Sequence, residues 1–170
     1  GEAARAAEAY LAAAEAARAA YSHEEAMRFF GRALALAPDS AAGVAFAAHE
    51  GREQILRVLG RRSERRQELE ALRERAERSG DPAWLALAFS RLARYDLDAA
   101  RPTGVDALLR RALEAAIEAG DRGAEIEALR LLGQLRREQG DTSGAIEALD
   151  RALARAGTDP AYLSARGQTL

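Results

Sequence analysis

The chain has 170 residues, of which 48% are hydrophobic and 31% are charged, a composition typical of soluble globular domains. Its formal net charge of −2 gives no support to nucleic-acid binding, and the lack of cysteine excludes a disulfide framework and thiol chemistry. No apolar run approaches the roughly 18 residues of a membrane span and no signal peptide is visible, so we expect a cytoplasmic protein without membrane or nucleic-acid partners.

Alanine and leucine, with 43 and 22 residues, dominate the apolar part of the chain, and residues that favour strands are scarce. Because alanine has the highest helix propensity, we predict an all-α fold. Glycine or proline beside aspartate, serine or threonine marks the ends of successive helices. These breaks delimit eight helices and part of a ninth, and they lie at 21–22, 38–40, 60, 80–82, 101–104, 120–121, 140–141 and 157–160.

A pattern of small and large residues recurs in every second helix. Ala145, Leu149 and Ala152 are spaced by four and three residues, which places them on one helical face. The equivalent large residues follow one another at intervals of 39, 40 and 40 residues, and they are Phe30, Leu69, Leu109 and Leu149. A fixed period of this kind indicates a repeat architecture.

These residues resemble the tetratricopeptide repeat, whose first helix is matched here by Leu132 and Gly133. The resemblance implies a right-handed superhelix of about four antiparallel helical hairpins. The 40-residue pitch is similar to the longer variant found in bacterial transcriptional regulators and signalling ATPases. We expect a single repeat domain over 1–170, as a piece of a larger protein. Its repeats are expected at about 5–38, 41–79, 82–119 and 122–157, with a partial capping helix at 159–170.

The second repeat departs from the family pattern. Arg65 stands where the family has a small residue, and His49, Arg52 and Glu53 stand where it has apolar ones. Because of these departures, the exact register of the first helix in each repeat stays undecided.

The two histidines, His23 and His49, lie in different predicted helices without an evident cluster of carboxylates, so we expect no metal site. Ser22 and Glu25 instead predict a capping box at the start of the second helix. No glycine-rich phosphate-binding motif is present, and no set of acid and base groups suggests a pocket. We therefore predict no catalytic residues, no cofactor and no enzymatic activity.

In the family that the chain resembles, the first helices line a concave groove. Arginine ends the stripe of residues that would face this groove in three of four repeats, and its planar fork suits carboxylates. The interpretation is a groove that binds an acidic peptide or helix. The alternative is a solvated face of mixed charge whose residues pair internally. The candidate partner-binding residues are Gln54, Arg57, Ser90, Arg94, Glu127, Arg130, Gln134 and Arg137.

The function predicted from these observations is a non-enzymatic scaffold or regulatory module that binds a peptide or a partner domain. Two alternatives stay open. In the first, the chain is a ligand- or signal-sensing domain that relays to an output domain of a larger bacterial regulator. In the second, it is a self-associating architectural module. Residues 1–20 are so rich in alanine that their predicted helix is apolar on nearly every side, which predicts a covering partner or a homodimer.

Overall fold

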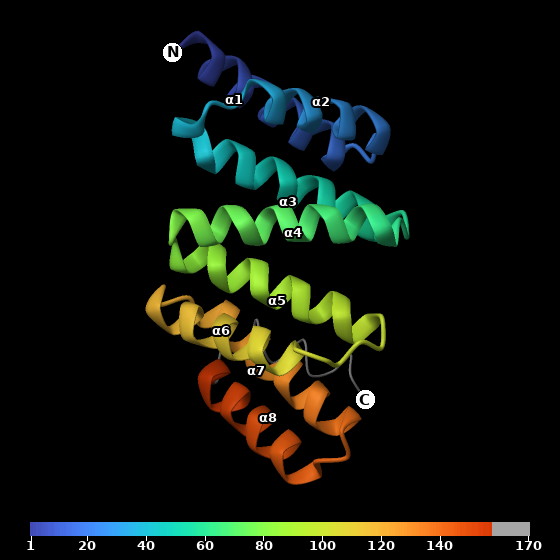
Figure 1. Ribbon diagram of the computed structural model, residues 1–170, viewed down its shortest axis with the longest axis vertical. Coiled ribbons are helices and arrows are strands. Elements are labelled where there is room, and N and C mark those ends of the chain that lie inside the picture. Colours follow the sequence, from blue (N-terminus) through green and yellow to red (C-terminus); the bar gives the residue numbers. More distant parts are fainter. Residues whose placement is uncertain (158–170) are drawn as a thin grey trace. The chain divides into compact units, whose positions relative to one another are not determined.

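The computed structural model describes residues 1–157, and over that range the chain forms eight α-helices, one short 3-10 turn at Asp39–Ala41, and no strand (Figure 1). The predicted all-α fold of helical hairpins is therefore confirmed. The capping helix predicted at 159–170 lies outside the described residues. The helices are α1 (Glu2–Ala19), α2 (His23–Leu36), α3 (Ala42–Val58), α4 (Arg62–Ser79), α5 (Pro82–Asp98), α6 (Val105–Glu118), α7 (Arg122–Glu138) and α8 (Thr142–Ala156).

The chain divides into two compact units, Gly1–Asp81 and Pro82–Leu170. The first unit contains the hairpins α1/α2 and α3/α4, and the second contains the hairpins α5/α6 and α7/α8. Within each unit, helices that follow one another along the chain pack against each other. Because the turns inside the hairpins are short, the paired helices run antiparallel.

Glycine followed by aspartate forms the turn on either side of α7. Gly120 and Gly140 adopt the left-handed conformation, with φ of 66° and 79°, which a residue with a side chain rarely adopts. The aspartate after each glycine caps the next helix. Asp121 Oδ1 accepts a hydrogen bond from the Ala124 N–H, and Asp141 Oδ1 accepts one from the Gly144 N–H, both at 2.9 Å.

The capping box predicted from Ser22 and Glu25 is wrong. The Ser22 side chain accepts no capping hydrogen bond at the start of α2. The turn closes through the backbone instead, because Tyr21 adopts a positive φ of 58° and the Ser22 N–H donates to the Ala17 carbonyl at 2.9 Å. A backbone hydrogen bond therefore closes this tight turn, where the sequence pattern predicts a side-chain hydrogen bond.

The apolar core of the first unit is centred on Phe30, which is completely buried on α2. Its ring lies against Gly51 of α3, where a Cβ atom would stand only 2.1 Å from Phe30 Cζ. The missing side chain of Gly51 is what lets the two helices close around the ring. The surrounding buried residues are Ala14, Ala17, Ala26, Ala33, Ala48 and Ile55.

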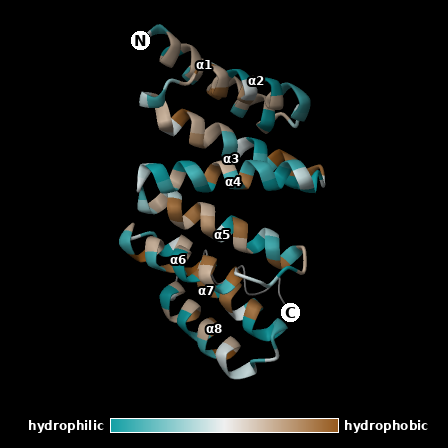
Figure 2. Ribbon diagram, viewed as in Figure 1, coloured by the Kyte–Doolittle hydropathy of each residue, from teal (hydrophilic) through white to brown (hydrophobic). Residues whose placement is uncertain are grey.

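The contact between α3 and α4 is built differently, because α4 is strongly hydrophilic (Figure 2). Glu53 of α3 is only 1% exposed, and its Oε1 accepts a hydrogen bond from Arg65 Nε of α4 at 2.7 Å. Two further side chains of α3, those of His49 and Arg52, bind the carboxylate of Glu68 on α4. The polar residues that break the repeat pattern thus pair with one another inside the hairpin.

Glu68 of α4 is the centre of this second buried group. Its Oε2 lies 2.7 Å from His49 Nδ1, and its Oε1 accepts a hydrogen bond from Arg52 Nε at 2.6 Å. Burial by itself raises the pKa of Glu68, but the hydrogen bond from His49 and the charge and hydrogen bond of Arg52 outweigh it, so that the pKa lies below its ordinary value of 4.5. Glu68 is therefore held as a carboxylate in the folded chain.

The second unit uses small residues and leucines at its helix contacts. Leu131 and Leu135 of α7 are completely buried and pack with Leu109 of α6. In the hairpin α7/α8, a Cβ atom at Gly133 would stand 2.9 Å from Leu149 Cγ. The Gly133 and Leu149 positions that match the repeat pattern in sequence therefore face each other across this hairpin.

Removal of Glu53 takes away a counter-ion of the buried Arg65. We expect Glu53→Ala to lower the free energy of unfolding by about 3–5 kcal/mol, whereas the double variant Glu53→Met/Arg65→Met is near neutral or stabilising. Urea unfolding of the full chain, followed by circular dichroism, measures both. Equal losses in the single and the double variant would contradict this account of the hairpin.

Gly51→Ala places a methyl group inside the Phe30 ring. We expect a loss of about 1–3 kcal/mol in the free energy of unfolding, because the core must shift to accept the methyl group. Gly31→Ala on α2 is the matched control. There the new Cβ meets only the Arg52 side chain, at 3.6 Å, so the higher helix propensity of alanine gives a gain of up to about 1 kcal/mol. If both variants change stability in the same direction, the close approach at Gly51 does not limit packing.

The lowered pKa of Glu68 predicts a loss of stability in acid. Ionised Glu68 stabilises the fold fully above about pH 4.5, and this contribution is lost as the pH falls through the lower pKa of the folded chain. Glu68→Gln removes that contribution, so its stability should change less than that of the wild type between about pH 5 and about pH 3. Glu74→Gln, at an exposed position of the same helix, is the control and should follow the wild type. Parallel pH profiles for the wild type and Glu68→Gln would refute the prediction.

Candidate functional site

The histidine and carboxylate side chains of residues 1–157 are the candidate ligands for a metal ion in this part of the chain. No group of three or more histidine, aspartate or glutamate side chains in this part of the chain could hold a metal ion. His49 is bound to Glu68 between α3 and α4, and His23 lies apart from it at the start of α2. Among the described helices, none combines the length and the apolar character needed to cross a membrane.

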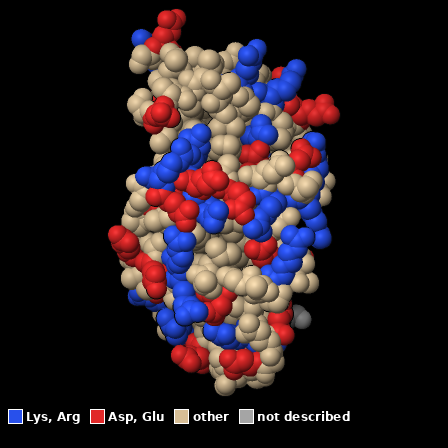
Figure 3. Space-filling view, in the orientation of Figure 1, with Lys and Arg blue, Asp and Glu red and all other residues tan. Residues whose placement is uncertain are grey.

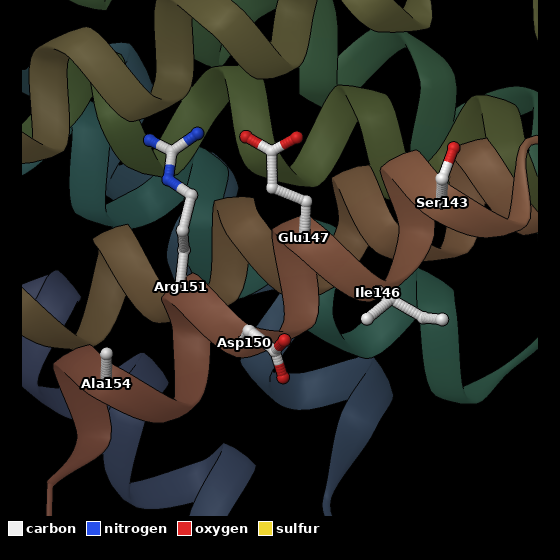
Figure 4. A pocket seen from close by; sticks show the side chains of 6 residues that line it. All are labelled: Ser143, Ile146, Glu147, Asp150, Arg151 and Ala154. Carbon is white, nitrogen blue, oxygen red and sulfur yellow. The ribbon is translucent and has the colours of Figure 1, made fainter.

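An open hollow lies on the outer face of α8, and Figure 4 shows the side chains that line it. All of them come from this single helix, so none faces a second wall. A small-molecule site encloses most of its ligand, which a surface formed by one helix does not do. The hollow is lined by Ser143, Ile146, Glu147, Asp150, Arg151 and Ala154.

The candidate partner-binding residues are divided between the two units. Gln54 and Arg57 lie on α3 in the first unit. Gln54 Nε2 donates a hydrogen bond to Glu50 Oε1 at 3.1 Å, and Arg57 is exposed near the end of the helix. The other six residues lie on α5 and α7 in the second unit, and these two helices contact each other.

In the second unit, the carboxylate of Glu127 on α7 lies between two guanidinium groups. It accepts two hydrogen bonds from Arg130 of the same helix, from Nε at 3.1 Å and from Nη2 at 3.2 Å. It also forms an ion pair with Arg94 Nη2 of α5. The side chains of Arg94, Glu127 and Arg130 are 38%, 33% and 44% exposed, so this cluster lies at the surface and bridges the two helices.

The remaining candidates on these helices differ in their accessibility. Ser90 of α5 is only 8% exposed and its hydroxyl has no hydrogen-bond partner, so it does not present the polar surface that the groove interpretation assigns to it. Its side chain is too short to extend beyond the packed helices. Gln134 Nε2 donates to Glu138 Oε1 at 3.0 Å, and Arg137 is exposed.

Two further ion pairs hold α7 against its neighbouring helices. Arg136 Nη2 of α7 lies 2.6 Å from Asp106 Oδ1 of α6. Arg155 Nε of α8 donates to Glu125 Oε1 of α7 at 2.6 Å, and this hydrogen bond and charge raise the pKa of Arg155. The partners are 30 residues apart in each pair, so no local signal in the sequence connects them.

Charged side chains of both signs are interspersed on the face of the molecule seen in Figure 3. A nucleic-acid interface would require a basic stripe or patch. The mixture of signs on this face differs from such a patch, and the described residues form local ion pairs such as Arg94–Glu127.

Comparison with known proteins finds a family match for the last part of the chain. Residues 126–169 match the family model of the tetratricopeptide repeat, a range that begins in α7 and includes α8. No curated protein matches the chain. The pattern of α7 and α8 recurs in α5 and α6 at an interval of 40 residues, from Leu109 to Leu149. The match supports a tetratricopeptide repeat over residues 126–169, and repeats of this family generally mediate protein–protein interactions.

Proposed function

We propose that the chain is a non-enzymatic binding module whose second unit binds an acidic segment of a partner protein. The binding surface is formed by α5 and α7, and we call it the α5/α7 face. It consists of Arg94, Glu127, Arg130, Gln134 and Arg137.

The excess of arginine on the α5/α7 face is the observation that carries this proposal. Three arginines, Arg94, Arg130 and Arg137, lie among two carboxylates, that of Glu127 and that of Glu138, which accepts a hydrogen bond from Gln134. An arginine guanidinium presents parallel N–H groups that fit both oxygens of a carboxylate. A partner segment with carboxylates at similar spacing would complement the face in charge and in geometry.

The expected affinity is modest. Ion pairs between exposed groups contribute about 0–1 kcal/mol each, because water screens them and the side chains lose freedom. A few such contacts give dissociation constants in roughly the micromolar to millimolar range. The binding should also weaken as the salt concentration rises.

Binding of a defined peptide tests the proposal. The probe is a short fluorescein-labelled peptide of alternating glutamate and alanine, titrated with the full chain and followed by fluorescence anisotropy. We expect Arg130→Glu/Arg137→Glu to weaken binding by about tenfold or more, because two attractive contacts become repulsive. The control, Arg110→Glu/Arg151→Glu, makes the same change in net charge on α6 and α8 and should bind like the wild type.

Two results would contradict the proposal. One is an equal loss of affinity in both double variants, which would show that only net charge matters. The other is equal binding of the peptide that carries lysine in place of glutamate.

A further inference from the structure

The site that an acidic ligand would use on the α5/α7 face already holds a carboxylate. Both oxygens of Glu127 are engaged, Oε2 by Arg130 Nε at 3.1 Å and Oε1 by Arg130 Nη2 at 3.2 Å. Arg94 pairs with Oε1 of the same carboxylate from the neighbouring helix. The two-point contact with Arg130 is the geometry in which arginine binds a carboxylate of any origin.

Glu127 differs from the acidic residues that hold helices together inside the chain. Glu53 and Glu125 are 1% and 7% exposed, and each pairs with an arginine of the partner helix in its hairpin. The Glu127 side chain is 33% exposed, and both of its arginine partners are more exposed still. Solvent and a ligand can therefore reach this cluster without unfolding the hairpin.

We propose that Glu127 is an internal competitor that occupies the arginine site until a partner carboxylate displaces it. This inference rests on the proposed function, since it concerns the same face and the same class of ligand. The exchange of one exposed carboxylate for another leaves the number of ion pairs unchanged. A ligand therefore gains affinity only from the contacts that it adds.

The competition restricts the class of partner. Glu127 is attached to the same helix as Arg130, so it competes at a high effective concentration with any free carboxylate. A ligand with a single carboxylate cannot overcome this advantage. A segment with several clustered carboxylates can, because its other groups reach Arg137 while one of them replaces Glu127. The proposed partner is thus a segment with clustered acidic residues.

A positioning role for Glu127 would have the opposite consequence. In that case the carboxylate would hold Arg94 and Arg130 in the orientation that the ligand needs, and its removal would weaken binding. The sign of the change in affinity after removal of the charge therefore separates competition from positioning.

Glu127→Gln is the decisive variant, because glutamine keeps the size of the side chain and its carbonyl oxygen still accepts a hydrogen bond from Arg130. The probes are the alternating glutamate–alanine peptide and a matched peptide with one glutamate among alanine and serine residues. We expect Glu127→Gln to bind the first about fivefold more tightly than the wild type does. We also expect the variant to bind the second, which the wild type does not bind measurably.

Glu147→Gln is the control, since it makes the same change in charge at an exposed position of α8, outside the α5/α7 face. It should bind both peptides like the wild type, and urea unfolding should show both variants to be folded. Unchanged or weaker binding by Glu127→Gln would overturn the competitor role of Glu127 while leaving the proposed function in place. An equal gain in Glu147→Gln would also overturn it, because the effect would be one of net charge. If neither the wild type nor Glu127→Gln binds the acidic peptide, the proposed function fails as well.

Discussion

The pairing of buried charges between α3 and α4 is the constraint on which the first unit depends. Arg65 and Glu53 have lost nearly all contact with water, and the hydrogen-bonded ion pair between them offsets part of the desolvation of each. Glu68 likewise depends on both His49 and Arg52. These buried charges meet their partners when α3 packs against α4 in this register. The hairpin therefore gains little stability from its charges, but any other pairing of α3 would leave them buried and unpaired.

The helices of the second unit pack together through a different chemistry. Its contacts are formed mainly by leucine and alanine, with Phe89 and Val105 also buried, and they require close shape complementarity, as at Gly133 and Leu149. Ion pairs appear there mainly around the margins of α7, where Asp106 and Arg155 bind it from α6 and α8. These contacts hold α7 on several sides. They give a rigid position to the residues that it contributes to the surface.

Arginine has several roles among the described residues, and its surroundings decide which one applies. Arg65 is a buried counter-ion, Arg136 links two helices at a half-exposed position, and Arg137 is exposed to solvent. The cluster around Glu127 lies between the last two cases, since it joins α5 to α7 and stays accessible. A contact of this kind costs little to break, which makes it suited to exchange with a ligand.

The helices, their ends and the repeat could be predicted from the sequence. The signals for them are local: alanine-rich segments, glycine–aspartate turns such as Gly120–Asp121, and the spacing of Ala145, Leu149 and Ala152. The candidate residues on α5 and α7 followed from the same period, except that the burial of Ser90 was not foreseen. The charge pairs could not be predicted in this way, because their partners lie 12 to 33 residues apart and meet only after the helices have packed. Periodicity shows which face of a helix is buried, but the chemistry of that face depends on the neighbour that it meets.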